Sequence, residues 1–335
     1  MKMEWDKTKT NDVIGLGNPL MDFLVEIEDD KFLEFDVAKG EMHLIDEEKA
    51  KEILNKISHH DLKIQTIPGG SCANTLKGIA ALGGSAILCG KVGDDAHGEL
   101  YVQEIEEHGV KSRLTKHKKT TGHCVTFVTP DSERTFSVHL GAALHFEKLD
   151  VFDIDIIKSK ILHLEGYQLE GECRETLLHA IKVAKNNKTL VSLDLADPGL
   201  IRRNKEFLLD LVKSSIDIVF VNEVEAKEFT GVEEKEALLE LVKCSKFAIV
   251  KLGKQGSLIS DGTSITNVSS YPAQAIDTTG AGDSYAAGFL YGLCHGFDLE
   301  TSGKLGSLLA AKVVEMMGVR IKDIDSIAVK NELGL

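Results

Sequence analysis

The sequence predicts an α/β protein built on a mainly parallel sheet with helices on both faces. Short apolar runs recur along the chain, and amphipathic stretches separate most of them. No internal repeat, low-complexity tract or Pro-rich linker interrupts this alternation. With 335 residues, 43% of them hydrophobic, the chain can bury a large core, and we expect one domain over residues 1–335.

The expected strands are the short apolar runs, which are bounded by turn residues. In chain order they lie at 13–17, 86–90, 161–165, 189–195, 216–222 and 247–252. The expected helices are the amphipathic stretches at 47–58, 97–108, 172–186, 201–213 and 234–243. After residue 270 the pattern changes to two successive helices at about 282–296 and 301–317.

Two regions break the strand–helix rhythm. Residues 20–45 continue from the first strand into more strand-like sequence, at 23–27, where a helix would be expected. Residues 121–140 hold two alternating strands, 122–128 and 134–140, with a turn-like stretch between them. Both regions predict a small β-sheet standing off the main one as a lid over a pocket. An ordinary β-extension without a role in binding is the alternative.

Composition excludes several classes of protein. A net charge of −14 argues against a nucleic-acid partner, because binding a phosphate backbone needs a basic surface. The six cysteines are dispersed without a C-x-x-C pair, which suits a reducing, cytoplasmic location and no cysteine metal site. The charged first twelve residues lack the apolar core of a signal peptide, and no apolar run is long enough for a membrane span. Both a monomer and a homodimer remain open.

A glycine turn opens the expected helix at 282–296. Gly280-Ala281-Gly282-Asp283 places small residues where a helix leaves its first N–H groups unpaired and carries partial positive charge. Such a turn predicts a cradle for a phosphoryl group. The same dipole should keep Asp283 ionised and able to accept a proton from an attacking hydroxyl. A well-capped helix without catalytic function is the alternative.

The longer run around this turn, DTTGAGDSYAAGFLYG at 277–292, resembles the C-terminal signature of the PfkB, or ribokinase-like, carbohydrate and nucleoside kinases. GGSCANTLKGIAALGGSAILCGKVGDDAHG at 69–98 resembles their N-terminal signature, and the likeness extends from about residue 12 to 320. The resemblance implies a ribokinase-like fold, with Asp283 as catalytic base and Gly280, Ala281 and Gly282 as anion hole. It also implies ATP and Mg²⁺ as cofactors and allows K⁺ as an activating cation.

The resemblance extends to a substrate site. The run GLGNPLMD, which contains Asn18 and Asp22, resembles the start of the adenosine kinase branch, where both residues hold the ribose. An amide and a carboxylate just after a strand also suit vicinal hydroxyls, although turn chemistry and a surface aspartate are the alternative. Gly69 and Gly70 permit close backbone approach, and Asn74 would bind a sugar hydroxyl from a helix start. A simple turn before that helix is the alternative.

A nucleotide site is implied as well. Asn222 and Glu225 resemble the family's N-x-x-E motif, which implies that Glu225 helps to place Mg²⁺ through water. A capped acidic helix start is the alternative. The segment 251–256 resembles the strand-turn that contacts ATP. The expected ATP and Mg²⁺ contacts are Asn222, Glu225, Lys251, Gly253, Gly256 and Thr278.

The predicted lid carries further site residues. Arg134 matches a lid arginine of adenosine kinase-like members and would neutralise the transferring phosphoryl group. An exposed turn arginine is the alternative. By the same alignment Phe136, Val138 and Leu44 line the base or sugar pocket, and Tyr167 stacks on the base. These four side chains would also suit a hydrophobic core.

The resemblance implies an ATP-dependent kinase that phosphorylates a small-molecule alcohol. A nucleoside, adenosine first, is favoured over a free sugar of ribokinase or fructokinase type. Three departures count against adenosine: Thr279 stands where animal adenosine kinases have asparagine, and Met42 and Gln168 replace expected polar and aromatic residues.

Two other classes are less favoured. An NAD-dependent oxidoreductase would need a third glycine after Gly15 and Gly17, where Leu20 stands, and no Walker A run occurs anywhere. A catalytically inactive ATP-binding regulator would have no use for Asp283 and its glycine turn.

Overall fold

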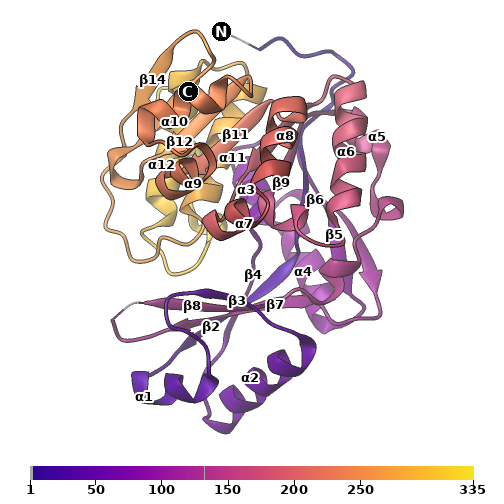
Figure 1. Cartoon of the computed structure of the whole chain (residues 1–335), viewed down its shortest axis with the longest axis vertical. Coiled ribbons are helices and arrows are strands. Elements are labelled where there is room, and N and C mark those ends of the chain that lie inside the picture. Colours follow the sequence, from indigo (N-terminus) through magenta and orange to yellow (C-terminus); the bar gives the residue numbers. More distant parts are fainter. Residues whose placement is uncertain (1–2, 132) are drawn as a thin grey trace.

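The computed structural model, described for residues 3–131 and 133–335, has a large sheet between two helical layers and a smaller sheet at one end (Figure 1). The large sheet has nine strands among these residues, and the smaller one has five. The predicted α/β fold, with a mainly parallel sheet, helices on both faces and a small second sheet, is therefore confirmed. Whether the chain unfolds as a single domain stays a prediction.

The large sheet runs in parallel from β6 to β12 and ends in two antiparallel strands. Its order is β14-β13-β12-β11-β10-β9-β1-β5-β6. From β1 the chain continues to one side through β5 and β6 and to the other side through β9. The strands are β1 (Asn11–Leu16), β5 (Ala86–Gly93), β6 (Val110–His117), β9 (Ser159–Glu165), β10 (Leu190–Asp194), β11 (Ile218–Asn222), β12 (Phe247–Lys251), β13 (Ser257–Ser260) and β14 (Ile265–Val268).

Helices cover the two faces of this sheet because successive strand residues point to opposite sides. Val13 packs into one hydrophobic cluster and Ile14 into the other. The first cluster is completed by α3 (Ser71–Ala81), α4 (Ala96–Glu107), α11 (Ala281–Cys294), α12 (Leu299–Val313) and α13 (Ser326–Glu332). The second is completed by α5 (Asp153–Ile157), α6 (Arg174–Asn186), α7 (Pro198–Arg203), α8 (Lys205–Ser215), α9 (Glu223–Thr230) and α10 (Glu234–Val242).

The small sheet, which we call the lid, forms the lower part of Figure 1. Its order is β3-β8-β7-β2-β4. The helices α1 (Asp29–Phe32) and α2 (Glu47–His59) cover its outer face, where Phe32 and Phe35 pack on Phe127. The strands are β2 (Leu20–Glu26), β3 (Met42–Leu44), β4 (Gln65–Pro68), β7 (Gly122–Val128) and β8 (Arg134–His139).

Several elements differ from the sequence predictions. The helix expected at 201–213 is two helices, α7 and α8, that meet at Asn204, whose φ of −123° is not helical. The edge strands β4, β6 and β14 were not predicted, because side chains of mixed polarity and exposure leave no clear apolar signal. The inner strand β13 was not predicted either, because its four residues are too short a run. No helix within the described part of the chain combines the length and apolarity needed to cross a membrane.

Candidate active site

A cavity of about 410 Å³ lies between the carboxyl edge of the large sheet and the lid. Parallel strands end at a common edge, so residues distant in sequence meet there. Glu165 ends β9, Asp194 ends β10, Asn222 ends β11 and Lys251 ends β12, and all four line the cavity. The cavity lies beside β1, where the chain changes direction across the sheet, which is the usual ligand position in open α/β sheets.

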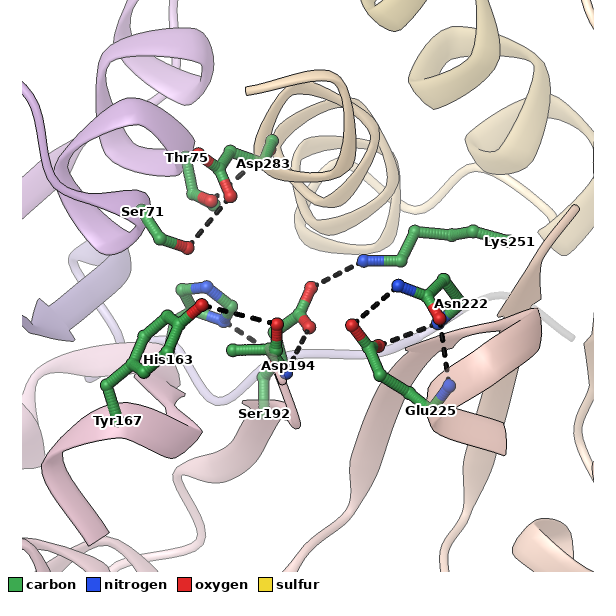
Figure 2. A network of polar contacts seen from close by, with 11 residues as sticks. Ser71, Thr75, His163, Tyr167, Ser192, Asp194, Asn222, Glu225, Lys251 and Asp283 are labelled. Carbon is green, nitrogen blue, oxygen red and sulfur yellow. Dashed lines mark hydrogen bonds and ion pairs between the residues drawn. The ribbon is translucent and has the colours of Figure 1, made fainter. Parts of the chain in front are cut away.

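Asp283 stands in the first turn of α11 and lines this cavity, as predicted. Its Oδ1 accepts a hydrogen bond from Ser71 Oγ at 2.8 Å, and its Oδ2 accepts one from Asn74 Nδ2 at 3.0 Å. Thr75 Oγ1 donates to the Asp283 carbonyl at 3.2 Å (Figure 2). Three residues of α3 therefore fix the orientation of the carboxylate, and each oxygen keeps a lone pair for a ligand.

The surroundings of Asp283 act on the pKa of its carboxyl in both directions. Burial raises the pKa of this carboxyl above its ordinary value, and the negative charge of Asp194 adds to that, although the bonds from Asn74 and Ser71 and the Lys251 charge act in the opposite direction. That Asp283 is ionised, as the helix dipole favours, stays a prediction. A base with a raised pKa is a stronger proton acceptor, which suits the predicted role.

The turn before Asp283 presents free amides, but not the predicted set. Gly280 has a φ of 72°, a left-handed conformation that favours glycine, and starts α11. The Ala281 amide donates to the Thr278 carbonyl at 3.2 Å, so it is not free for an anion. Among the described residues the amides of Gly280, Gly282 and Asp283 have no hydrogen-bond acceptor. We call these three amides the cradle, and their binding of an anion stays a prediction. Gly282 and Asp283 line the cavity, whereas Gly280 and Ala281 do not.

Asp22 faces the cavity from the lid strand β2. No donor among the described residues bonds to its carboxylate, and burial, with the charges of Asp283 and Asp277, raises its pKa to about 7 despite the opposing charge of Lys77. Any side-chain atom added at Gly69 would overlap this carboxylate, which explains the glycine there. Asp22 is therefore an unpaired acceptor available to a ligand.

The predicted contact of Asn18 is partly occupied by the protein. Its amide N–H donates to Glu165 Oε1 at 3.2 Å, and its Oδ1 accepts from Gln168 at 3.2 Å, while its side chain still borders the cavity. Gly70, with a φ of 94°, packs against the Asn18 carbonyl. A side chain at Gly70 would therefore push the turn away from β1.

Asn74 lines the cavity from the start of α3, and its contact with a sugar hydroxyl stays a prediction. Its Nδ2 is bonded to Asp283, while its buried Oδ1 has no partner among the described residues. Asn74 is thus first an orienting residue for the carboxylate. The residue lines the cavity, and its Oδ1 has the capacity to accept a hydrogen bond.

The lid supplies an apolar wall in two rows set by strand register. One row crosses the sheet through Ile67, Asp22, Cys124, Val138 and Leu44. The next row contains Leu24, Thr126, Phe136 and Met42. All nine line the cavity, and Asp22 is the one charged side chain of these two rows. Phe136, Val138 and Leu44 are therefore on the cavity wall, and their contact with a base or sugar stays a prediction.

Tyr167 faces the lid from the core, directly after β9. Its hydroxyl donates to the Ala196 carbonyl at 3.4 Å, and Ala196 adopts a left-handed φ of 65° that is strained for a residue with a side chain. Tyr167 therefore lines the cavity with its ring held from the core side, and its stacking on a base stays a prediction.

Arg134 reaches from β8 to the loop that precedes α11. Its guanidinium forms an ion pair with Asp277 at 3.0 Å and donates to Thr279 Oγ1 at 3.0 Å. The Asp277 carboxylate is fully buried and also accepts the amides of Thr279, at 2.8 Å, and Gly318, at 2.7 Å. Arg134 borders the cavity as predicted, but a buried carboxylate already compensates its charge.

Asn222 and Glu225 form a closed capping box at the start of α9 (Figure 2). Asn222 Oδ1 accepts the Glu225 amide at 2.9 Å, and the two Glu225 oxygens accept the amide and Nδ2 of Asn222 at 2.7 and 2.6 Å. Burial and the nearby Asp194 raise the pKa of Glu225. The structure therefore shows the capped acidic helix start that was the alternative interpretation of these residues. Both side chains nevertheless border the cavity.

These residues fit Mg²⁺ only through water. Among residues 3–131 and 133–335, no group of three or more His, Cys, Asp and Glu side chains is arranged to hold a metal ion. Mg²⁺ keeps several waters and is often held by one or two carboxylates together with substrate phosphates. Asp194, which ends β10, and Glu225, in the first turn of α9 after the neighbouring strand β11, both line the cavity and meet that requirement.

Three predicted nucleotide contacts lie outside this cavity: Gly253, Gly256 and Thr278. Gly256 has a φ of 96° and closes the turn between β12 and β13, where its amide donates to the Gly253 carbonyl at 3.1 Å. The Thr278 carbonyl is bound to the Ala281 amide. Gly253 borders open space, so its contact with ATP stays a prediction.

Sequence reasoning missed four side chains of the site: Ser71, Glu165, Asp194 and Asp277. Glu165 accepts the amides of Asn18 and Cys72, and burial raises its pKa to about 7. Glu165 and Asp194 each lie at the end of a predicted strand, so the common edge of a parallel sheet could have identified them. Ser71 carried no comparable signal.

Comparisons with known proteins agree with this geometry. The family described as pfkB family carbohydrate kinase matches residues 37–326. The structure of a probable sugar kinase from Rhizobium etli is 31% identical and superposes with a TM-score of 0.90, covering 97% of this chain and 99% of that one. Adenosine kinase from Sinorhizobium meliloti is 32% identical, with a TM-score of 0.88 and coverage of 96% and 99%. Adenosine kinase from Saccharomyces cerevisiae is 29% identical over 92% of this chain and 96% of its own.

The family match spans most of the chain, and it includes both the glycine turn and Asp283. The Rhizobium etli and Sinorhizobium meliloti structures share the architecture of this chain over nearly its whole length. The chain belongs to the pfkB family of carbohydrate kinases and is a phosphotransferase that acts on a hydroxyl group.

Proposed function

We propose that this kinase transfers the γ-phosphate of ATP to the 5′-hydroxyl of a nucleoside such as adenosine, with Asp283 as catalytic base. The division of the cavity carries the proposal. One end holds Asp22 and Asp283, which suit a sugar, and the lid wall beside them is a broad apolar surface, which suits a flat aromatic base. A free sugar, with hydroxyls on most of its carbons, would leave that wall without a partner.

The residues around Asp283 account for proton removal. The carboxylate accepts the proton of the acceptor hydroxyl as that oxygen attacks the γ-phosphorus. The new O–P bond forms while the bond from the γ-phosphorus to the bridging oxygen of ADP breaks, and the proton passes later from Asp283 to solvent. The amides of Gly280, Gly282 and Asp283 would stabilise the negative charge on the phosphoryl oxygens.

Asp22 would bind the ribose. Its carboxylate has no donor among the described residues, so a cis-diol can supply two hydrogen bonds to it. This pairing would also favour the ionised form and lower the raised pKa of Asp22. The free Oδ1 of Asn74 would accept from a further hydroxyl.

Mg²⁺ would reach the site with the phosphates of ATP and compensate part of their charge. Glu225 and Asp194 would hold its water shell, which agrees with the donor set described above. Activation by K⁺ remains a prediction that a titration of potassium chloride against a choline salt would test.

An ADP-release assay across adenosine, other nucleosides, ribose and fructose tests the proposal. We expect kcat/KM for the best nucleoside to exceed that for either sugar by at least about a hundredfold, because only the nucleoside covers the apolar wall. Turnover with ribose or fructose equal to that with every nucleoside would contradict it.

A PfkB-type sugar kinase of the ribokinase or fructokinase kind is the second candidate. The observation in its favour is the close superposition on the protein named as a probable sugar kinase in Rhizobium etli. The same assay separates the two candidates, since a sugar kinase would release ADP with a free sugar and not with adenosine.

A further inference from the structure

Lys77 is a charged residue within the hydrophobic core. It lies on α3 and is only 2% exposed, and it does not line the cavity. Among the described residues its ammonium group forms no ion pair, and its one hydrogen bond goes to the Pro68 carbonyl at 2.8 Å. Burying a charge without a paired counter-charge is costly, and an apolar side chain of the same length would avoid that cost. The ammonium group at this position therefore needs a physical explanation.

The carbonyl that Lys77 holds lies where the lid joins the core. Pro68 ends the lid strand β4, and α3 begins shortly after it. The next carbonyl, that of Gly69, accepts a hydrogen bond from the Tyr101 hydroxyl at 2.7 Å, and the Gly69 amide donates to the Leu20 carbonyl at 2.8 Å. Two buried side chains therefore fix this joint from the core.

Asp22 lies against the same joint. Any side-chain atom added at Gly69 would overlap the Asp22 carboxylate. A single peptide unit, between Pro68 and Gly69, therefore separates the Lys77 ammonium group from that carboxylate. Opposite charges this close attract strongly in a buried site, because little water screens them.

Two carboxylates of the cavity keep Lys77 protonated. Burial lowers the pKa of Lys77 to about 8, and the charges of Asp22 and then Asp283 oppose burial. Glu104 and Lys322, which pair with each other at 3.6 Å, have smaller and opposite effects on this pKa. At pH 7 the Lys77 side chain therefore carries its charge most of the time.

The charge of Lys77 acts in turn on Asp22. Burial raises the pKa of the Asp22 carboxyl to about 7, and Lys77 lowers it against the charges of Asp283 and Asp277. Among the described residues Lys77 is the one cation with this effect. Two other titratable groups near the carboxylate are neutral at pH 7 because burial raises the pKa of each: the Cys124 thiol and the Tyr101 hydroxyl. Without Lys77, Asp22 would be mostly protonated at pH 7.

We propose that Lys77 is a positioning residue for substrate binding: held on the Pro68 carbonyl, its ammonium group keeps the neighbouring Asp22 carboxylate ionised and able to accept the hydroxyls of the acceptor. The inference rests on the proposed function, in which Asp22 binds the ribose. An ionised carboxylate accepts hydrogen bonds from both hydroxyls of a cis-diol, whereas the protonated group uses one oxygen as a donor. Lys77 itself does not touch the substrate and acts through Asp22.

The alternative is that Lys77 only supports the joint through its hydrogen bond to the Pro68 carbonyl. Two variants separate the charge from the hydrogen bond. Lys77→Met removes both, whereas Lys77→Gln removes the charge and keeps an N–H donor. A role through charge requires both variants to alter Asp22, and Lys77→Gln carries the test should Lys77→Met not fold.

Lys9 offers a matched control, because it is another lysine with little exposure, at 9%. Its three donors are all used by protein groups: the carbonyls of Ile157 and Asn187, at 2.8 and 2.9 Å, and Thr189 Oγ1, at 2.6 Å. None of these four residues lines the cavity. Lys9→Met should lower Tm and leave the titration of Asp22 unchanged. A shift as large as in the Lys77 variants would mean that loosening of the fold moves the titration, which would contradict the proposal.

The charge state of Asp22 can be measured by NMR without any ligand. The aspartate carboxyl carbons are labelled with ¹³C, and the signal that is missing from Asp22→Asn identifies Asp22. We expect its titration midpoint to rise by about one pH unit or more in both Lys77 variants, because an opposite charge is lost. A midpoint that is unchanged or lower in folded Lys77→Gln would overturn the proposal.

Binding supplies a second readout, measured by isothermal titration calorimetry. Because the ionised form of Asp22 binds the diol, Kd for adenosine at pH 7 should rise about fivefold or more in Lys77→Gln, and at pH 9 the two proteins should agree within about twofold. In the Asp22→Asn background, Lys77→Gln should change Kd by less than about twofold. A rise of equal size at pH 7 and pH 9, or an equal rise in that background, would show that Lys77 does not act through the charge of Asp22.

Failure of the nucleoside assignment is distinguishable from failure of this inference. A wild type that neither binds nor phosphorylates adenosine would reject the substrate. The NMR titration contains no ligand, so it would still decide whether Lys77 sets the charge of Asp22.

Discussion

The two walls of the cavity differ in chemistry and in how the chain builds them. The core wall gathers charged and amide side chains from the ends of four parallel strands and from the first turn of α11. The lid wall presents two rows of mostly apolar side chains, with Asp22 as the one charge in them. Under the proposed function, the core wall would perform the transfer and the lid wall would select the acceptor.

The comparison predicts that a change in the core wall affects kcat and a change in the lid wall affects KM. Substrate binding uses both walls, while charge develops only near the core. A substitution in the lid that lowered kcat, or a substitution in the cradle that raised only KM, would contradict this division.

Gly282→Ala should produce the largest of the following effects. The added methyl group would border the cradle and the Lys251 ammonium group, and we expect kcat to fall by about 10²–10³-fold because the amides lose access to the phosphoryl oxygens. Stability should not fall, since alanine favours a helix over glycine by about 0.5–1 kcal/mol. Thermal unfolding and ADP release test both parts, and an unchanged kcat would show that no phosphoryl group binds there.

Asp22→Ala should raise KM for adenosine by about 10–100-fold with a smaller effect on kcat, because a charged acceptor for the ribose hydroxyls is lost. The control is a 2′-deoxynucleoside, for which the same substitution should matter less. If KM rises equally for both acceptors or does not change, the ribose hydroxyls do not bind at Asp22.

Phe136→Ala should raise KM for a nucleoside by up to about tenfold, because the base loses apolar contact with the lid. The rate with ribose as acceptor should not respond. Phe152→Ala, a partly exposed phenylalanine that does not line the cavity, is the control. Equal effects of Phe136→Ala on ribose and adenosine would mean that this side chain supports the lid and does not contact the base.

The last of these predictions concerns how the free energy of unfolding depends on pH, and it involves the core wall alone. Burial raises the pKa of Glu165 from 4.5 to about 7, so the folded chain holds a proton that the unfolded chain releases in that range. Stability from this group is present below about pH 4.5 and lost as the pH rises toward 7, by an amount on the order of 3 kcal/mol.

Glu165→Gln removes this titration, so the difference in Tm between wild type and variant should move in favour of the variant as the pH rises from 5 to about 7.5. Exposed Glu206→Gln serves as the control. A Tm difference independent of pH would show that Glu165 is ionised throughout.

Much of the fold and of this site could be predicted from the sequence, for identifiable reasons. Apolar runs buried on both faces revealed the central strands, and the glycine turn before Asp283 revealed the cradle. The polar edge strand β6 and the single-residue break at Asn204 had no periodic signal. Side-chain pairing could not be predicted either. Arg134 forms an ion pair with Asp277, and Asn74 donates a hydrogen bond to Asp283, only because the lid and α3 pack against α11 and the loop before it.

The central claim is that the Asp283 carboxylate removes the proton of the acceptor hydroxyl, and steady-state turnover of Asp283→Asn tests it most directly. The asparagine keeps the bonding partners Ser71 and Asn74 within reach but cannot accept the proton. We predict a kcat lower by about 10²–10⁴-fold, with KM for adenosine and Tm nearly unchanged. A kcat within a few-fold of the wild type would contradict the account.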